Sequence, residues 1–145
     1  MNFFKPTAIF LLLAIVSCGE KKSSKDDFKL DESSLSPLDQ KISNGKKVYE
    51  KTCLACHQVD GKGVEGAFPP LVSSDYFAND KMLVVKNIVH GLKGEITVNG
   101  KKYNAEMPKQ VLTEQEVSDV ATYVLNSFNN KGGEISIEEV QSIIK

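Results

Sequence analysis

The stretch Cys53-Leu54-Ala55-Cys56-His57 decides the fold, because its C-x-x-C-H pattern is typical of the covalent attachment of a c-type haem. Two cysteines three positions apart lie on the same side of a helical turn, so both thiols can reach the two vinyl groups of one porphyrin. The histidine follows directly and can place a ring nitrogen beneath the iron. The segment therefore predicts one haem c, with iron, held by Cys53 and Cys56 and ligated by His57.

Three other uses of a cysteine pair compete with haem attachment. A thioredoxin-like redox motif needs a surrounding βαβ pattern, which the neighbouring sequence does not show. A structural disulfide leaves His57 without a role. A zinc site needs a second Cys/His pair, and His90 is the only other histidine in the chain. Haem attachment is the interpretation that uses all three residues of the motif.

The N-terminus has the layout of an export signal. Lys5 is the only charge before a short apolar run, which is too short to span a bilayer. The run ends in an apolar, apolar, small, Cys sequence at Cys18 that resembles the bacterial lipobox. This resemblance implies cleavage before Cys18 and lipidation of Cys18. We therefore expect residues 1–17 to be a lipoprotein signal peptide and residues 18–37, rich in charge and serine, to be a flexible lipid-anchored linker.

The same signal predicts an exported protein that is anchored to a membrane and faces the periplasm. Gly19, and not an aspartate, follows Cys18, which favours the outer membrane in a two-membrane bacterium. The net charge of -1 argues against a nucleic-acid partner, because such partners require a basic surface. All 18 basic residues are lysines. We expect them to serve as a solvated surface and in transient docking, not in bidentate recognition of phosphate or carboxylate.

Local patterns outside the motif predict a mostly helical domain. Capping boxes begin helices at Thr113 and Ser136, and Asn99-Gly100 is typical of a two-residue hairpin turn. Apolar periodicity and these signals predict helices over 38–53 and 80–90 and after 113 and 136, with a hairpin over 96–103. We expect the domain to cover residues 38–130 and a C-terminal tail with a short helix to cover 131–145.

The chain resembles class I cytochrome c over residues 42–128. Beyond C-x-x-C-H, the resemblance is carried by Gly45 and Tyr49 where the first helix crosses the last, by Tyr123 on that last helix, by Ala67-Phe68-Pro69-Pro70-Leu71 as a proline loop, and by Glu106-Met107-Pro108 as a distal methionine loop. The resemblance implies an all-α fold, a bundle of three to five helices around one covalently bound haem, here with a small β-hairpin insertion.

Met107 is the predicted sixth ligand of the iron. Met82 lies on the apolar face of a predicted helix and His90 lies at its end, so a core role and a solvated or capping role suit them better. Met107 lies in a loop before Pro108, as the family resemblance also implies. His57 should donate its second ring N–H to a carbonyl, which the resemblance assigns to Pro69 or Pro70; we favour Pro70.

A His/Met pair occupies both axial positions and favours ferrous iron. This predicts a single-electron carrier without enzymatic activity that works between respiratory or periplasmic redox proteins. Two alternatives stay open: a haem peroxidase or gas sensor, which requires Met107 to leave the iron, and a haem subunit of a larger oxidoreductase complex. The hairpin and the C-terminal tail resemble cytochrome domains that accompany copper nitrite reductases, so such an enzyme or a terminal oxidase is a candidate partner.

Overall fold

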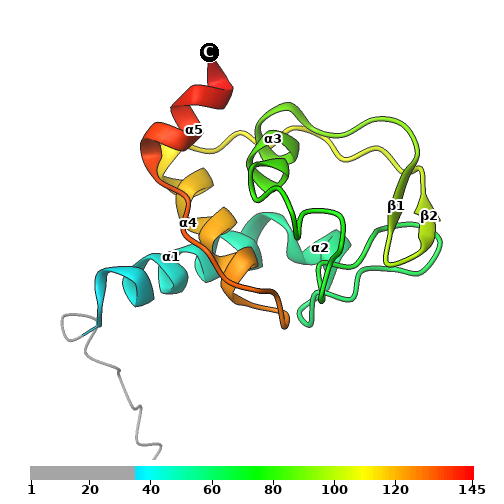
Figure 1. Cartoon of the computed structure of the whole chain (residues 1–145), viewed down its shortest axis with the longest axis horizontal. Coiled ribbons are helices and arrows are strands. Elements are labelled where there is room, and N and C mark those ends of the chain that lie inside the picture. The colour runs from blue at the N-terminus through cyan, green and yellow to red at the C-terminus, as the bar shows by residue number, and fades with distance from the viewer. Residues whose placement is uncertain (1–34) are drawn as a thin grey trace, which may run out of the picture. The chain divides into compact units, whose positions relative to one another are not determined.

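The computed structural model describes residues 35–145 (Figure 1). The predicted signal peptide, the lipidation site Cys18 and most of the predicted linker lie outside the described residues. Within them the elements are α1 (Pro37–Thr52), α2 (Leu54–His57), α3 (Met82–His90), β1 (Ile96–Val98), β2 (Lys101–Tyr103), α4 (Glu114–Asn126) and α5 (Ile137–Ile144). The prediction of an all-α fold with three to five helices and one small hairpin is confirmed. No helix of this part of the chain is long and apolar enough to cross a bilayer.

Helix α1 begins at Pro37, the last residue of the predicted linker. Ser36 is its N-cap, and the Ser36 hydroxyl accepts a hydrogen bond of 3.2 Å from the backbone N–H of Asp39. Proline suits the first helical position because its missing N–H would have no intrahelical partner there. The capped start fixes the register of α1, which ends at Thr52 with Cys53 as its C-cap, directly before α2.

Helices α1 and α4 cross closely at Gly45. A Cβ atom on Gly45 would lie 2.7 Å from the Cβ of Tyr123 and would also collide with the Asp119 carbonyl group, so only glycine fits. Beside the crossing, the ring of Tyr49 packs 5.4 Å from that of Tyr123 and 5.3 Å from that of Phe128. The close helix crossing expected at Gly45 is confirmed, and it anchors the end of α1 that leads into the cysteine motif.

The hairpin and the end of α3 follow their predicted signals. Gly91 ends α3 with φ +75°, a left-handed conformation that glycine adopts at little cost. Asn99 (φ 50°) and Gly100 (φ +76°) both have positive φ between the antiparallel strands, as a type I′ turn requires. The inward-facing residues Val98 and Tyr103 are buried at the strand ends. The hairpin therefore contributes side chains to the interior.

The C-terminal segment after residue 130 contains the short helix α5, and it packs into the core of the domain. Ile135 and Val140 are fully buried, and α5 packs against α3 and α4. The backbone of Ile135 accepts a hydrogen bond of 2.7 Å from the Ser118 hydroxyl, and its N–H donates to the Thr122 hydroxyl at 3.0 Å. These bonds satisfy two buried hydroxyls of α4, so removing the tail would leave them unpaired.

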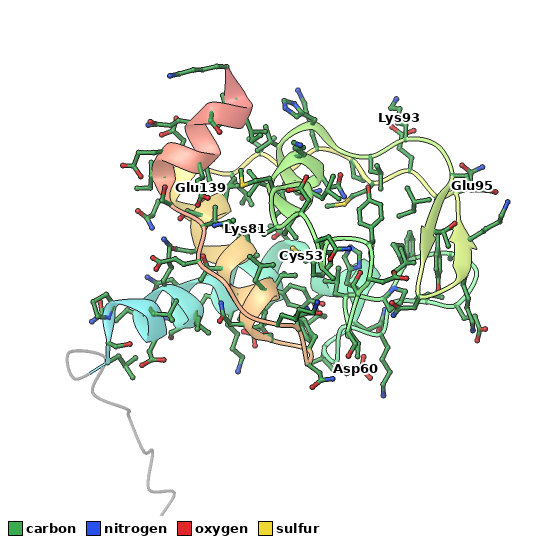
Figure 2. The ribbon with its side chains drawn as sticks, viewed as in Figure 1. Cys53, Asp60, Lys81, Lys93, Glu95 and Glu139 are labelled. Carbon is green, nitrogen blue, oxygen red and sulfur yellow. The ribbon has the colours of Figure 1, made fainter. Side chains whose placement is uncertain are left out.

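A salt bridge also ties α5 to the start of α3. The Lys81 ammonium lies 2.8 Å from the Glu139 carboxylate, and it donates a 2.7 Å hydrogen bond to the Glu134 carbonyl (Figure 2). At the other end of α3, the ring nitrogen Nε2 of His90 lies 3.1 Å from the Ile143 carbonyl oxygen. The C-terminal helix thus holds α3 at both ends.

Candidate functional site

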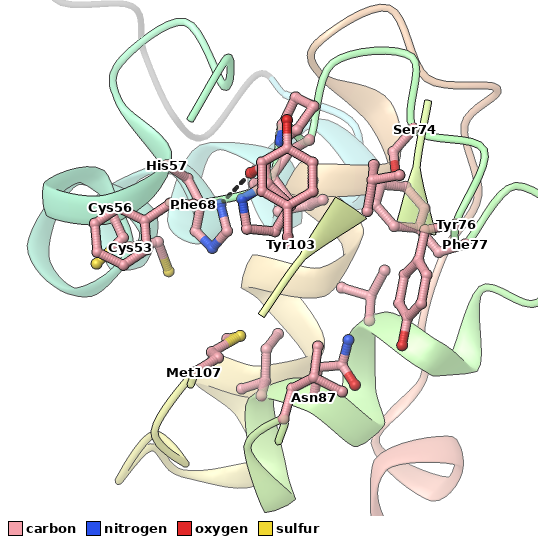
Figure 3. Close-up of a pocket in the computed structure, with 18 of the residues that line it drawn as sticks. Cys53, Cys56, His57, Phe68, Ser74, Tyr76, Phe77, Asn87, Tyr103 and Met107 are labelled. Atoms are coloured by element: carbon pink, nitrogen blue, oxygen red, sulfur yellow. Dashed lines mark hydrogen bonds between the residues drawn. The ribbon is translucent and has the colours of Figure 1, made fainter. Parts of the chain in front are cut away.

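The cysteine motif forms one tight turn at the end of α1. The N–H of Cys53 donates to the Tyr49 carbonyl at 2.9 Å, and the N–H of His57 donates to the Cys53 carbonyl at 3.0 Å. Cys53, Cys56 and His57 all line a single cavity, and the two cysteines form no disulfide. Burial raises the pKa of the Cys53 thiol, which is partly offset by its hydrogen bond with Thr52. The structure therefore places both predicted attachment residues at the same cavity edge (Figure 3).

The imidazole of His57 is oriented by the carbonyl group of Pro69. The distance from Nδ1 to the Pro69 oxygen is 3.1 Å, so the prediction of Pro70 as the acceptor is wrong. Gly63 explains the geometry, since a Cβ there would lie 2.6 Å from the Pro69 oxygen and the loop could not pass so closely. Pro70 itself still lines the cavity.

The second ring nitrogen of His57 points into the cavity (Figure 3). Burial lowers the pKa of His57, and the Pro69 carbonyl opposes that shift by stabilising the ring N–H. A neutral imidazole whose Nδ1–H is held by a carbonyl presents its Nε2 lone pair in a fixed direction. This is the arrangement that a metal-ligating histidine needs.

Met107 lies across the cavity from His57 (Figure 3). Its backbone pairs with Leu92 through hydrogen bonds of 2.8 and 3.0 Å, and these fix the loop against the end of α3. Gly91 permits this approach, because a Cβ there would lie 2.6 Å from the Met107 carbonyl oxygen. The thioether is half-buried and packs against the core.

Met82 and His90, the other candidate ligands of the iron, were predicted to have other roles, and both lie outside the cavity. Met82 packs against the core cluster, and His90 is exposed at the end of α3; neither lines the cavity. Among the described residues, His57 and Met107 are the histidine and methionine that line it. Sequence reasoning therefore selected the residues that the fold brings together.

Sequence reasoning missed a set of polar residues on the cavity wall: Ser74, Tyr76, Asn87 and Tyr103. No sequence signal marks them, because a loop, a helix and a strand converge only in the folded chain. The rest of the wall is mainly apolar and includes Phe68, Leu71, Phe77, Ile88, Val98 and Val124. Two thiols, an oriented imidazole, an opposed thioether and an apolar wall together fit a covalently attached haem.

Comparison with known proteins agrees with this fit. The model of the family described as Cytochrome c matches residues 42–128. Cytochrome c-552 of Thermus thermophilus is 31% identical over 93 residues, which cover 61% of this chain and 70% of that protein. Cytochrome c6 of Gloeothece citriformis is 37% identical over 84 residues, covering 57% of this chain and 67% of that protein.

A longer relative matches over a smaller share of its length. The fructose dehydrogenase cytochrome subunit of Gluconobacter japonicus is 30% identical over 113 residues, which cover 71% of this chain and 22% of that subunit. The family match spans the cysteine motif, the Pro69 loop and the Met107 loop, which are the segments that surround the cavity. The chain belongs to the cytochrome c family as a class I c-type cytochrome, and its cofactor is a covalently bound c-type haem with iron.

Proposed function

We propose that this protein is a single-electron carrier in which His57 and Met107 are the two axial ligands of the haem iron. The observation that carries the proposal is the placement of the Met107 thioether across the cavity from the free ring nitrogen of His57. When bound, the haem supplies a one-electron ferric/ferrous couple. Two protein ligands leave no position for a substrate, so the proposed activity is electron transfer without catalysis.

The residues of the chain set the conditions for that couple. Pro69 holds the His57 ring in one orientation, and the Leu92 pairing holds the Met107 backbone. The apolar wall excludes water and favours the less charged, reduced centre, and a thioether ligand acts in the same direction. Because both supports are backbone contacts, we expect little reorganisation when the oxidation state changes.

The electron donor and acceptor are proposed to be other redox proteins. The relatives named as dehydrogenase cytochrome subunits support a second candidate function, in which this chain is the haem subunit of a larger oxidoreductase complex. A copper nitrite reductase or a terminal oxidase remains the proposed kind of acceptor for a free carrier. Copurification of a dehydrogenase partner would favour the complex, and a monomeric holoprotein would favour the carrier.

The proposed location is the periplasmic side of a membrane, with Cys18 lipidated. The support is the lipobox-like sequence before Cys18. Two or more acyl chains anchor a protein stably. Cys18→Ser should therefore release the exported protein into the soluble fraction with an unchanged visible spectrum. A wild-type protein that is wholly soluble after export would contradict the anchor without affecting the haem.

The axial ligation is tested with Met107→Ala. The wild-type holoprotein should show the weak far-red band of Met-to-ferric ligation and should resist carbon monoxide when reduced. The variant should lose the band and bind carbon monoxide, and its midpoint potential should fall by on the order of 0.1 V, within the ≈ 0.8 V that axial ligands span. Met82→Leu is the matched control, because Met82 packs in the core outside the cavity.

Two results would overturn the carrier proposal. Rapid carbon monoxide binding by the reduced wild type would show an open iron position and favour the peroxidase or sensor alternative. An unchanged band and potential in Met107→Ala would show that another group ligates the iron.

A further inference from the structure

The backbone of Gln58 is strained, and Gln58 directly follows the proximal histidine. It has φ 63° and ψ 165°, a combination that is essentially confined to glycine because a Cβ atom crowds the neighbouring backbone. A residue other than glycine keeps such a conformation only where surrounding contacts impose it. The Gln58 side chain donates a hydrogen bond of 3.3 Å to the Ala55 carbonyl, which is long and exposed and stabilises the conformation little. The stronger support comes from another residue.

The hydroxyl of Tyr49 holds the Gln58 carbonyl group. It donates a hydrogen bond of 2.7 Å to the Gln58 oxygen, the usual length for a hydroxyl donor. Tyr49 is 1% exposed, so water competes little for this bond. The N–H of Gly61 donates to the same oxygen at 3.2 Å. Two donors therefore fix the orientation of the peptide group that leaves Gln58.

Tyr49 contacts both ends of the haem-attachment motif. Its carbonyl accepts the N–H of Cys53 at 2.9 Å, and its hydroxyl reaches the residue that follows the motif. The ring has little freedom to move, because it packs 5.4 Å from the Tyr123 ring and 5.3 Å from the Phe128 ring. A single well-packed side chain thus connects the start of the motif to Gln58.

The direction in which the chain leaves Gln58 sets the position of the loop that orients His57. The N–H of Gly63 donates to the His57 carbonyl at 3.0 Å, and Gly63 lies directly against Pro69. The Pro69 carbonyl lies 3.1 Å from Nδ1 of His57. If Gln58 relaxed to a negative φ, the loop would leave in another direction and carry the Pro69 acceptor away from the ring.

We propose that Tyr49 is a positioning residue for the proximal ligand, because its hydroxyl keeps Gln58 in the strained conformation and so keeps His57 aligned with the Pro69 carbonyl. This inference rests on the proposed role of His57 as an axial ligand. An imidazole that donates its second ring N–H to a carbonyl is held in one orientation and is a more basic ligand. The Tyr49 hydroxyl acts on this ligand through the backbone of Gln58.

The experiment compares Tyr49→Phe with Tyr123→Phe in the holoprotein. Each change removes one hydroxyl oxygen from the same ring cluster, and the Tyr123 hydroxyl has no hydrogen-bond partner among residues 35–145. We expect Tyr49→Phe to speed solvent exchange of the His57 Nδ1 proton, measured by NMR, about tenfold, the factor that one hydrogen bond typically contributes. Its midpoint potential should rise, because a less basic ligand stabilises ferric iron less. Tyr123→Phe should match the wild type in both.

The role of backbone strain is tested by rescue in the Tyr49→Phe background. Gln58→Gly should restore the wild-type exchange rate and potential, since glycine adopts a positive φ without support. Gln58→Ala is the matched control and should not rescue, because it also removes the side-chain amide but keeps the Cβ atom. Equal effects of glycine and alanine would overturn the proposal, and so would wild-type behaviour of Tyr49→Phe.

The far-red methionine band separates this inference from the proposed function. It should persist in Tyr49→Phe, since Met107 is unchanged. Absence of the band in the wild type would contradict ligation by Met107, whereas the exchange of the His57 proton would still report on Tyr49. If Tyr49→Phe does not accumulate, its combination with Gln58→Gly decides: recovery of a wild-type holoprotein supports the proposal, and failure of this double variant to accumulate overturns it.

Discussion

The two sides of the haem cavity are built in different ways. On the proximal side, Cys53, Cys56 and His57 share one turn, and local hydrogen bonds hold them together. On the distal side, Met107 reaches the cavity only after a loop, α3 and the hairpin, and its backbone depends on Leu92. The proximal side is therefore a property of a short segment, whereas the distal side is a property of the packed domain.

The distal side has further supports that lie far from it in sequence. The N–H of Gln110 donates to the Ile88 carbonyl at 2.9 Å, so the methionine loop is tied to α3 at Gln110 as well as to Leu92, just after α3, at Met107. Helix α3 is itself held at its start by the Lys81–Glu139 salt bridge to α5. Loss of the contact between α5 and α3 should therefore loosen the Met107 loop more than it loosens the turn that holds Cys53, Cys56 and His57.

The largest expected effect comes from the proximal side. Cys53→Ala combined with Cys56→Ala should reduce covalent haem to background and leave an open apolar cavity in an unstable chain. Haem staining after denaturing electrophoresis measures this directly. Ala55→Ser is the matched control, since Ala55 is exposed within the same motif and both thiols remain. Full haem staining of the double variant would show that attachment does not depend on the cysteine motif. The proximal side would then not be specified by this short segment.

A smaller effect should separate the two sides. Gly91→Ala places a methyl group against the Met107 backbone, where the Cβ would lie 2.6 Å from the carbonyl oxygen. We expect the far-red methionine band to weaken several-fold while covalent haem is retained. Gly94→Ala is a strict control, because Gly94 also has positive φ (+93°) but has nothing within 4 Å of an added Cβ. Equal bands in both variants would show that backbone strain, and not the contact, controls the distal loop.

The smallest expected effect is the pH dependence of the α5 contact. Hydrogen bonding to Lys81, followed by the Ser136 backbone N–H, lowers the pKa of Glu139. A folded pKa below the unfolded value stabilises the protein above the unfolded pKa, about 4.3 for glutamate, and this contribution is lost as pH falls through the folded pKa. Both side chains are more than a third exposed, so the salt bridge contributes at most about 1 kcal/mol.

Glu139→Gln isolates this charge, since glutamine also completes a capping box with Ser136. Urea unfolding should show a stability deficit near pH 7 that disappears near pH 3. Glu50→Gln serves as the control, because its carboxylate lies 3.9 Å from Lys46 on the exposed face of α1 and the deficit should be smaller. A deficit that is constant with pH would indicate a packing effect instead of a charge effect.

Much of the fold follows from short sequence signals. The capping boxes at Thr113 and Ser136 form as expected, and the hairpin turns at Asn99-Gly100. These features depend on groups within four residues of one another, so neighbouring side chains and glycine conformations are enough to specify them. The extent of the core was not predictable in the same way, because the burial of Ile135 and Val140 depends on helices that precede them in the chain.

The sequence by itself determined the attachment chemistry, since two thiols and an imidazole in one turn dictate how a porphyrin is held. The tertiary structure decided which proline carbonyl orients His57, because the path of the Gly63 loop sets whether Pro69 or Pro70 comes within reach. It also decided the composition of the cavity wall, which Ser74 and Tyr103 line from different parts of the chain. Such groups are brought together by packing between distant segments, and no local pattern records that arrangement.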